Sequence, residues 1–182
     1  RLKKGDTVID HTSGNTGTAV AMAASVLGLH AILTTPEKTS KEKVNLMRSF
    51  GAEVIITPTD AKYNDPNSSH SVAVALAQEH GYFHLNQYDN PDNVEAHYKL
   101  TGPEIWNDTQ GKITHFVAGI GTGGTLSGTA KYLKEINPNI QTIAVDPEGS
   151  IFTPYIKDKR IVTPGTYKVE GIGSEVITKS LL

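Results

Sequence analysis

The sequence predicts an α/β protein built on a parallel β-sheet, and three observations lead to this fold class. Short apolar or β-branched runs alternate along the chain with helical patterns of about 10–15 residues, which is typical of βαβ units. Two of these runs end in glycine-rich, hydroxyl-rich turns, at residues 12–17 and 121–125, and each turn opens a helical pattern. No internal period of about 20–50 residues indicates a repeat array instead.

The expected strands are short runs rich in Val, Ile, Thr and aromatic residues. They cover residues 7–10, 31–35, 53–57, 82–85, 115–120 and 142–145. We expect loops at residues 60–69 and 86–93, where turn-forming and polar residues gather. Beyond Ile151 the pattern fades, and we expect loops to the end of the chain.

The expected helices are defined by their composition and by the residues at their ends. They cover residues 15–28, 40–50, 70–80, 94–108 and 125–136. The first is rich in Ala and ends at Gly28, a residue type that favours helix C-termini. Ser40 opens the second helix, and Gly51 closes it. In the fourth helix the pair Gly102-Pro103 predicts a break or a kink.

Composition excludes several function classes. The 182 residues are 37% hydrophobic and 20% charged, with a formal net charge of −2, so neither nucleic acid nor an anionic membrane surface is an expected partner. No apolar run reaches the roughly 18–20 residues of a membrane-spanning helix. The absence of cysteine excludes disulfides and thiolate chemistry and fits a cytoplasmic protein. The seven histidines are scattered along the chain, and we predict no metal site.

The turn at residues 121–125 has the chemistry of a phosphate-binding loop. Gly121, Gly123 and Gly124 let the backbone approach an anion because no Cβ intervenes. Thr122 and Thr125 add hydroxyl donors, and the start of the following helix adds N–H groups and a positive dipole end. The Lys of a nucleoside-triphosphate loop is missing, so that ligand class is not expected.

A dinucleotide site is an alternative interpretation of the same turn. Gly119-x-Gly121-x-x-Gly124 follows an expected strand and precedes a helix. Asp146 ends the next strand at a spacing that suits a ribose-binding acid. This turn alone therefore leaves NAD and a simpler phosphorylated cofactor as equal alternatives.

The turn at residues 12–17 favours the simpler phosphorylated cofactor. Thr12, Ser13, Asn15 and Thr16 bring together small donors that suit a carboxylate and a hydroxyl oxygen. Gln87 belongs to a second polar cluster, residues 86–88, that we expect at the same cleft. Phosphate on one side and carboxylate on the other describe an amino acid joined to a phosphorylated cofactor.

The stretches Thr12-Ser13-Gly14-Asn15-Thr16-Gly17 and Gly121-Thr122-Gly123-Gly124-Thr125 together resemble the cystathionine β-synthase and cysteine synthase family. The resemblance covers essentially the whole chain. It implies a pyridoxal 5′-phosphate (PLP) enzyme of fold type II, a three-layer parallel-sheet fold like that of the tryptophan synthase β-subunit. Residues 1–182 would form one catalytic unit, incomplete in this chain, with a smaller lobe at 12–85 and part of a larger lobe at 86–182.

The resemblance also implies roles for single residues. Asn15 would hydrogen-bond the 3′-oxygen of PLP, and Gly171 would line the cleft above the cofactor. The residues implied for the phosphate are Gly121, Thr122, Gly123, Gly124 and Thr125. Those implied for the substrate α-carboxylate are Thr12, Ser13, Thr16 and Gln87. The lysine that binds PLP covalently is expected before Arg1, so this segment alone is expected to be inactive.

The implied activity is β-replacement on serine or O-acetylserine with a thiol, carried out by a homodimer. Residues 86–88 and 145–150 favour synthesis of cystathionine from serine and homocysteine, whereas residues 101–106 are closer to cysteine synthases, which use sulfide. Ser174 matches neither pattern, since many cystathionine β-synthases have tyrosine there and cysteine synthases often have alanine. An NAD oxidoreductase and a truncated, non-catalytic paralogue remain as distant alternatives.

Overall fold

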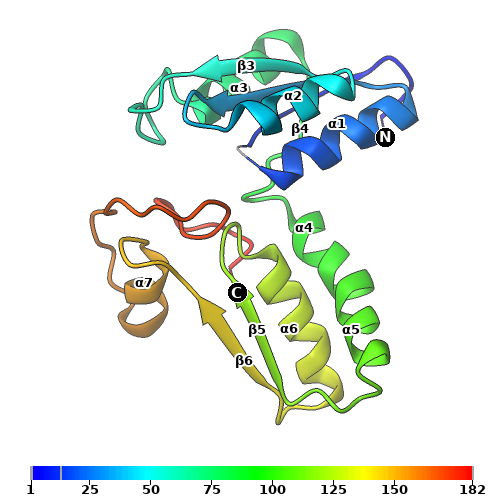
Figure 1. The fold of residues 1–182 in the computed structure, drawn as a ribbon, viewed down its shortest axis with the longest axis vertical. Coiled ribbons are helices and arrows are strands. Elements are labelled where there is room, and N and C mark those ends of the chain that lie inside the picture. Colours follow the sequence, from blue (N-terminus) through cyan, green and yellow to red (C-terminus); the bar gives the residue numbers. More distant parts are fainter. Residues whose placement is uncertain (1, 13, 182) are drawn as a thin grey trace. The chain divides into compact units, whose positions relative to one another are not determined.

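The computed structural model describes residues 2–12 and 14–181, and the chain divides into two compact units, residues 1–86 and 87–182 (Figure 1). Each unit is an α/β structure with its own parallel sheet. None of the helices in the described part of the chain has the length and hydrophobicity needed to cross a bilayer.

The first unit contains a four-stranded parallel sheet in the order β3-β2-β1-β4. Its strands are β1 (Thr7–His11), β2 (His30–Pro36), β3 (Glu53–Thr57) and β4 (Phe83–His84). The connecting helices are α1 (Asn15–Leu27), α2 (Lys41–Ser49) and α3 (Ser69–His80). These elements agree with the predicted strands and helices to within one or two residues at each end.

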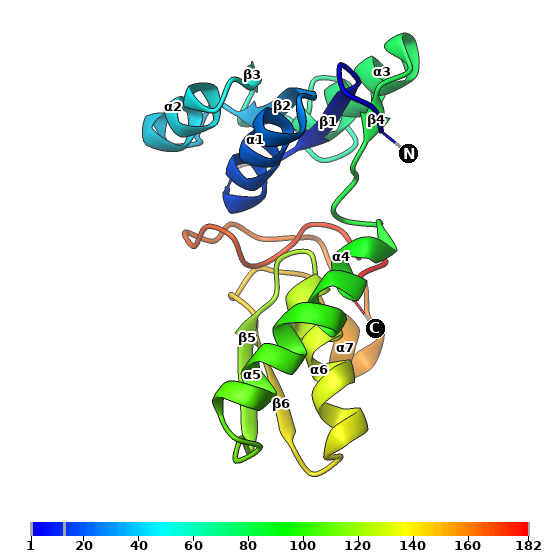
Figure 2. The same ribbon diagram turned by 90° about the vertical axis from the view of Figure 1, so that its right-hand side faces the viewer.

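The alternation of side chains along β1 gives the sheet two buried faces. Val8 packs with α1 and α2 in one apolar cluster, whereas Ile9 packs with Ala73 and Ala77 of α3 in another. Accordingly, α1 and α2 lie on one side of the sheet and α3 lies on the other (Figure 2). A parallel sheet covered on both faces leaves its functional groups at the carboxyl ends of the strands, where β1 runs into the turn at residues 12–17.

The second unit is built around two parallel strands, β5 (His115–Gly119) and β6 (Gln141–Val145). Its α-helices are α4 (Pro91–Ala96), α5 (Gly102–Asp108), α6 (Gly124–Ile136) and α7 (Phe152–Asp158), and a π-helix, η1 (His97–Thr101), joins α4 to α5. Phe116, Leu133 and Ile140 form the centre of its core, with Ile105 and Trp106 of α5 packed against them. The strand β5 leads directly into the glycine-rich turn that precedes α6.

The predicted loop at residues 86–93 is wrong in its last part, because α4 begins at Pro91. Asn90 caps this helix through its side chain, which accepts a hydrogen bond from the Asp92 N–H at 2.9 Å. Pro91 suits the first helical position, where no N–H is needed. The predicted break at Gly102-Pro103 is replaced by the π-helical turn of η1, a local widening that interrupts the regular hydrogen-bond pattern ahead of Pro103.

The expectation of loops beyond Ile151 is also wrong in part, because residues 152–158 form α7. Asp146 stabilises its start, since Oδ2 accepts hydrogen bonds from the N–H and the hydroxyl of Thr153, both at 2.8 Å. Phe152 is fully buried and anchors the helix. The start of α7 is therefore determined in part by Asp146, which lies outside the helix and seven residues before Thr153.

Candidate functional site

The turn at residues 121–125 offers backbone N–H groups at the start of a long helix. The first hydrogen bond of α6 runs from Ser127 N–H to the Gly123 carbonyl at 2.9 Å. The N–H groups of Gly124 and Thr125 precede that bond, so the helix itself does not use them; the Gly124 N–H makes a long contact of 3.4 Å with the Thr122 hydroxyl. Such an N-terminus, at the carboxyl end of β5, is suited to bind an anion.

The space around the glycines of this turn excludes side chains. A Cβ on Gly121 would lie 2.6 Å from the carbonyl oxygen of Gly171, and one on Gly124 would overlap the Asn93 side chain. Gly123 has a φ of 94°, in the left-handed region that favours glycine. The glycines therefore allow the turn to pack closely against neighbouring chain segments, and the N–H donors at the start of α6 fit a phosphate group such as that of PLP.

Three side-chain hydrogen bonds hold the turn in place. The amide of Asn93 donates to the Gln87 carbonyl at 2.8 Å and to the Thr122 hydroxyl at 2.9 Å. From the other side, the Thr178 hydroxyl donates to the Thr122 carbonyl at 2.6 Å. Within the second unit, these bonds connect Gln87 and Thr122, two residues that the sequence predicted for the site. Gly171 lies against the same turn through its contact with Gly121.

His97 supports the last residue of the turn. Its Nε2 lies 3.0 Å from the Thr125 hydroxyl, and its Nδ1 lies 2.9 Å from the Thr101 hydroxyl. Burial lowers the pKa of His97, which favours the neutral imidazole. A neutral ring donates through one nitrogen and accepts through the other, so a single tautomer satisfies both hydroxyls.

The turn at residues 12–17 belongs to the first unit and is held by Thr12. The buried Thr12 hydroxyl accepts hydrogen bonds from Gly14 N–H at 3.3 Å and from Gly17 N–H at 3.1 Å. Asn15 is the first residue of α1 and is exposed, whereas Thr16 is half-buried. Ser13, also predicted for the site, lies outside the described residues.

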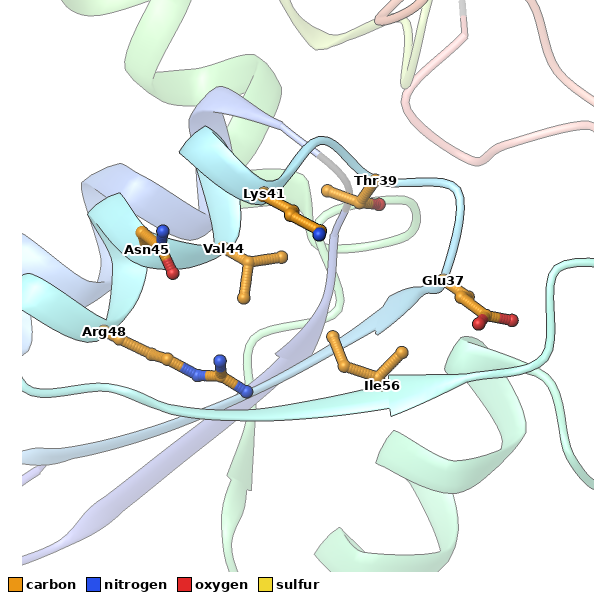
Figure 3. A pocket seen from close by; sticks show the side chains of 7 residues that line it. All are labelled: Glu37, Thr39, Lys41, Val44, Asn45, Arg48 and Ile56. Atoms are coloured by element: carbon orange, nitrogen blue, oxygen red, sulfur yellow. The ribbon is translucent and has the colours of Figure 1, made fainter.

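The same unit has a pocket of 310 Å³ that contains none of the predicted site residues (Figure 3). Its lining side chains come from α2, from β3 and from the segment between β2 and α2: Glu37, Thr39, Lys41, Val44, Asn45, Arg48 and Ile56. The Arg48 guanidinium donates a hydrogen bond to the Val54 carbonyl at 3.3 Å and so helps to hold α2 against β3. We assign no ligand to this pocket.

Sequence reasoning missed three residues that organise the second turn, namely Asn93, His97 and Thr178. Asn93 falls at the end of the loop expected at residues 86–93, and Thr178 lies 56 positions beyond Thr122, the residue that it contacts. No local pattern marks either of them. The polar clusters around residues 12–17, 87 and 121–125, by contrast, were visible as departures from ordinary turn composition.

A parallel strand that ends in a glycine-rich turn with N–H donors at a helix start is typical of α/β proteins that bind an anionic group at a strand end. The chain belongs to the pyridoxal-phosphate dependent enzyme family, which matches residues 1–181. This family membership confirms the cofactor class and the family inferred from the two turns, and it favours PLP over the dinucleotide alternative.

The relatives include both kinds of enzyme in the predicted family, cystathionine β-synthases and cysteine synthases. The chain is 49% identical over 177 residues to cystathionine β-synthase of Apis mellifera, covering 97% of this chain and 35% of that protein. It is 41% identical over 182 residues to cysteine synthase of Staphylococcus aureus (strain N315), covering 100% of this chain and 56% of that protein. The chain thus spans about a third to a half of the length of these relatives.

The solved structures confirm the predicted fold class. O-ureido-L-serine synthase superposes with a TM-score of 0.86 at 29% identity, over 97% of this chain and 54% of that one. Its lysine-to-alanine mutant with bound O-ureido-L-serine gives a TM-score of 0.85 at 30% identity. The chain therefore has the parallel-sheet α/β fold of this synthase over the part that it spans.

Proposed function

We propose that the intact protein catalyses a PLP-dependent β-replacement, in which a thiol replaces the hydroxyl of serine or the acetoxy group of O-acetylserine. The glycine-rich turn at residues 121–125, held by Asn93 and Thr178, is the observation that carries this proposal. The high identity to cystathionine β-synthases supports serine and homocysteine as substrates and cystathionine as product.

Cysteine synthesis from O-acetylserine and sulfide is the second candidate. It is supported by 41% identity to a cysteine synthase over the whole chain. Ser174 is buried, and its hydroxyl donates to the Val176 carbonyl at 2.6 Å, so we assign it a structural role rather than a part in choosing the substrate. Product analysis with each substrate pair separates the two activities.

The proposed roles of the residues follow from their chemistry. When bound, PLP supplies an electron sink that stabilises negative charge at the substrate Cα. The N–H groups and hydroxyls of residues 121–125 would hold its phosphate, and the exposed amide of Asn15 would donate to its 3′-oxygen. These contacts fix the orientation of the cofactor and lower the entropic cost of reaction.

The substrate carboxylate would be bound by Thr12, Ser13, Thr16 and Gln87. The Thr12 hydroxyl already accepts two backbone hydrogen bonds, which leaves its O–H proton to donate to an anion. Gly171 has a φ of 83° and open space at its Cα, so its backbone can lie next to a ligand. We further propose that the enzyme acts as a cytoplasmic homodimer and that the lysine that binds PLP covalently lies outside residues 1–182.

Replacing Asn15 with alanine in the full-length protein tests the cofactor site. Loss of a hydrogen bond to a charged group costs about 1.5–3 kcal/mol, so we expect PLP affinity to fall by about 10–100-fold. The visible absorbance of bound PLP should also change, because the 3′-oxygen is part of its chromophore. Titration of the apoenzyme with PLP measures both effects.

The matched control is Asn45→Ala, which removes an exposed asparagine from α2 of the same unit. We expect this variant to bind PLP like the unmodified protein. Equal PLP affinity and equal spectra for Asn15→Ala and the unmodified protein would contradict the role given to Asn15.

A further inference from the structure

Three side chains with metal-binding atoms converge at the carboxyl ends of β1 and β4. Asp10 Oδ1 lies 3.5 Å from His11 Nδ1 and 3.5 Å from His84 Nε2. One ligand atom from each of the three residues can be chosen so that all lie within 4.8 Å of one another. Parallel pairing of the two strands, which sets Ile9 opposite His84, brings these residues together across the sequence.

Asp10 Oδ1 accepts a hydrogen bond from the His11 backbone N–H at 3.0 Å, and its distances to the two imidazole nitrogens also fit a shared metal ion. Both separations from Asp10 Oδ1 exceed the ~2.7–3.2 Å of a well-formed hydrogen bond. Two ligands bound tetrahedrally at about 2.0–2.1 Å from zinc are roughly 3.4 Å apart, which is close to the observed 3.5 Å.

The ligand types narrow the choice of metal. Two imidazole nitrogens and one carboxylate oxygen suit zinc and neighbouring transition metals, whereas calcium and magnesium prefer oxygen ligands. A set of three protein ligands also leaves a fourth position open, as in catalytic zinc sites. We propose that Asp10, His11 and His84 form a binding site for a divalent transition-metal ion of the zinc class.

The surroundings of the cluster support a built site. Asp10 is fully buried and His11 is 5% exposed, so neither side chain is an ordinary surface group. The side chain of His84 is 18% exposed, which gives an ion a path from solvent to the cluster. The His70 ring stands edge-on to His11 with centroids 4.8 Å apart, and Tyr63 stacks on His70 at 4.1 Å, so packed rings limit the rotation of His11.

A metal ion would add to the stabilisation of the buried Asp10 carboxylate. This group accepts a hydrogen bond from the His11 backbone N–H at 3.0 Å, and a positive charge next to a buried carboxylate stabilises it further. A divalent ion supplies that charge while both imidazoles remain neutral, as metal ligation requires. Because His11 directly precedes the turn at residues 12–17, the ion would also fix the position of that turn on the sheet.

Cobalt(II) titration of the full-length protein, after treatment with a chelator, tests the proposal. We expect one equivalent of Co²⁺ to give visible ligand-field absorbance, read as a difference spectrum against the metal-free protein, and Zn²⁺ to displace it. Replacing the ligands, as in His84→Ala or Asp10→Asn, should weaken binding by more than about 100-fold, since even loss of an outer hydrogen bond to a ligand costs about 10–100-fold.

His80→Ala is the matched control, because His80 is an exposed histidine at the end of α3, four residues before His84. It should bind Co²⁺ like the unmodified protein. Absence of saturable one-to-one binding in the unmodified protein would overturn the proposal even if a ligand variant fails to fold. Equal affinity of His84→Ala and His80→Ala would overturn it as well. The readout does not depend on PLP, so a failed PLP assignment leaves the test intact.

Discussion

At the scale of single residues, His97 should make the stability of the protein depend on pH, and it contacts Thr125 of the glycine-rich turn. Burial lowers its pKa below the ordinary value of 6.5, so the unfolded chain binds this proton more readily than the folded chain. Stability should therefore decrease as the pH falls from about 6.5 toward the lowered pKa. Protonation of the ring would also remove its acceptor and break one of the two bonds to Thr101 and Thr125.

We expect His97→Gln to remove part of this pH dependence. The free energy of unfolding, measured with urea between pH 5 and pH 7, should vary less steeply in the variant than in the unmodified protein. His30→Gln is the control, because His30 is an exposed residue of β2. Equal slopes for His97→Gln and the unmodified protein would show that His97 does not cause this dependence.

The residues of the candidate site differ in how well the sequence predicts them. Gly121, Gly123 and Gly124 can be found from composition alone, because runs of glycine and threonine are rare outside binding turns. The side chains that hold the turn cannot, since Asn93 and Thr122 are 29 positions apart. The prediction of no metal site likewise considers only spacings along the chain. The convergence of Asp10, His11 and His84 depends on strand pairing, which no spacing rule detects.

At the scale of elements, the packing of α6 against the η1 turn depends on Gly128. A Cβ at this position would overlap the Val94 carbonyl and lie 2.8 Å from His97 Cβ and 2.9 Å from Tyr98 N. Two of these three atoms are backbone, so they cannot turn away as a flexible side chain would. The π-helical turn thus lies close to α6 only because residue 128 has no side chain.

Gly128→Ala should therefore destabilise the protein, although alanine favours a helix by about 1 kcal/mol over glycine. We expect a net loss of about 1–3 kcal/mol in the free energy of unfolding, because overpacking forces the backbone apart. Urea denaturation measures it. The reverse exchange in the same helix, Ala130→Gly, should cost about 1 kcal/mol through propensity alone. A gain of stability in Gly128→Ala would contradict the close contact.

Element prediction succeeded where one local rule was sufficient. Gly28 and Gly81 end α1 and α3 in left-handed conformations, and Ser40 caps α2, as such residues commonly do. It failed where the deciding contact is distant or the helix is irregular. The cap of α7 comes from Asp146, and the π-helical turn before Pro103 has no composition of its own.

At the scale of the whole molecule, the chain consists of two compact units with separate cores. The sequence predicted lobes at residues 12–85 and 86–182, and the compact units are residues 1–86 and 87–182. Leu33 is fully buried in the core of the first unit, and Leu133 is fully buried in that of the second. Each core is formed by residues of its own unit.

Substitutions in the two cores should consequently act on different sets of amides. Leu33→Ala and Leu133→Ala each remove a buried side chain, which costs about 2–5 kcal/mol. We expect Leu33→Ala to speed hydrogen exchange mainly in residues 1–86 and Leu133→Ala mainly in residues 87–182, because local opening follows cooperative units. Hydrogen–deuterium exchange read by mass spectrometry resolves the two ranges. If both variants lose protection equally throughout the chain, the two cores form one cooperative unit and the expectation is wrong.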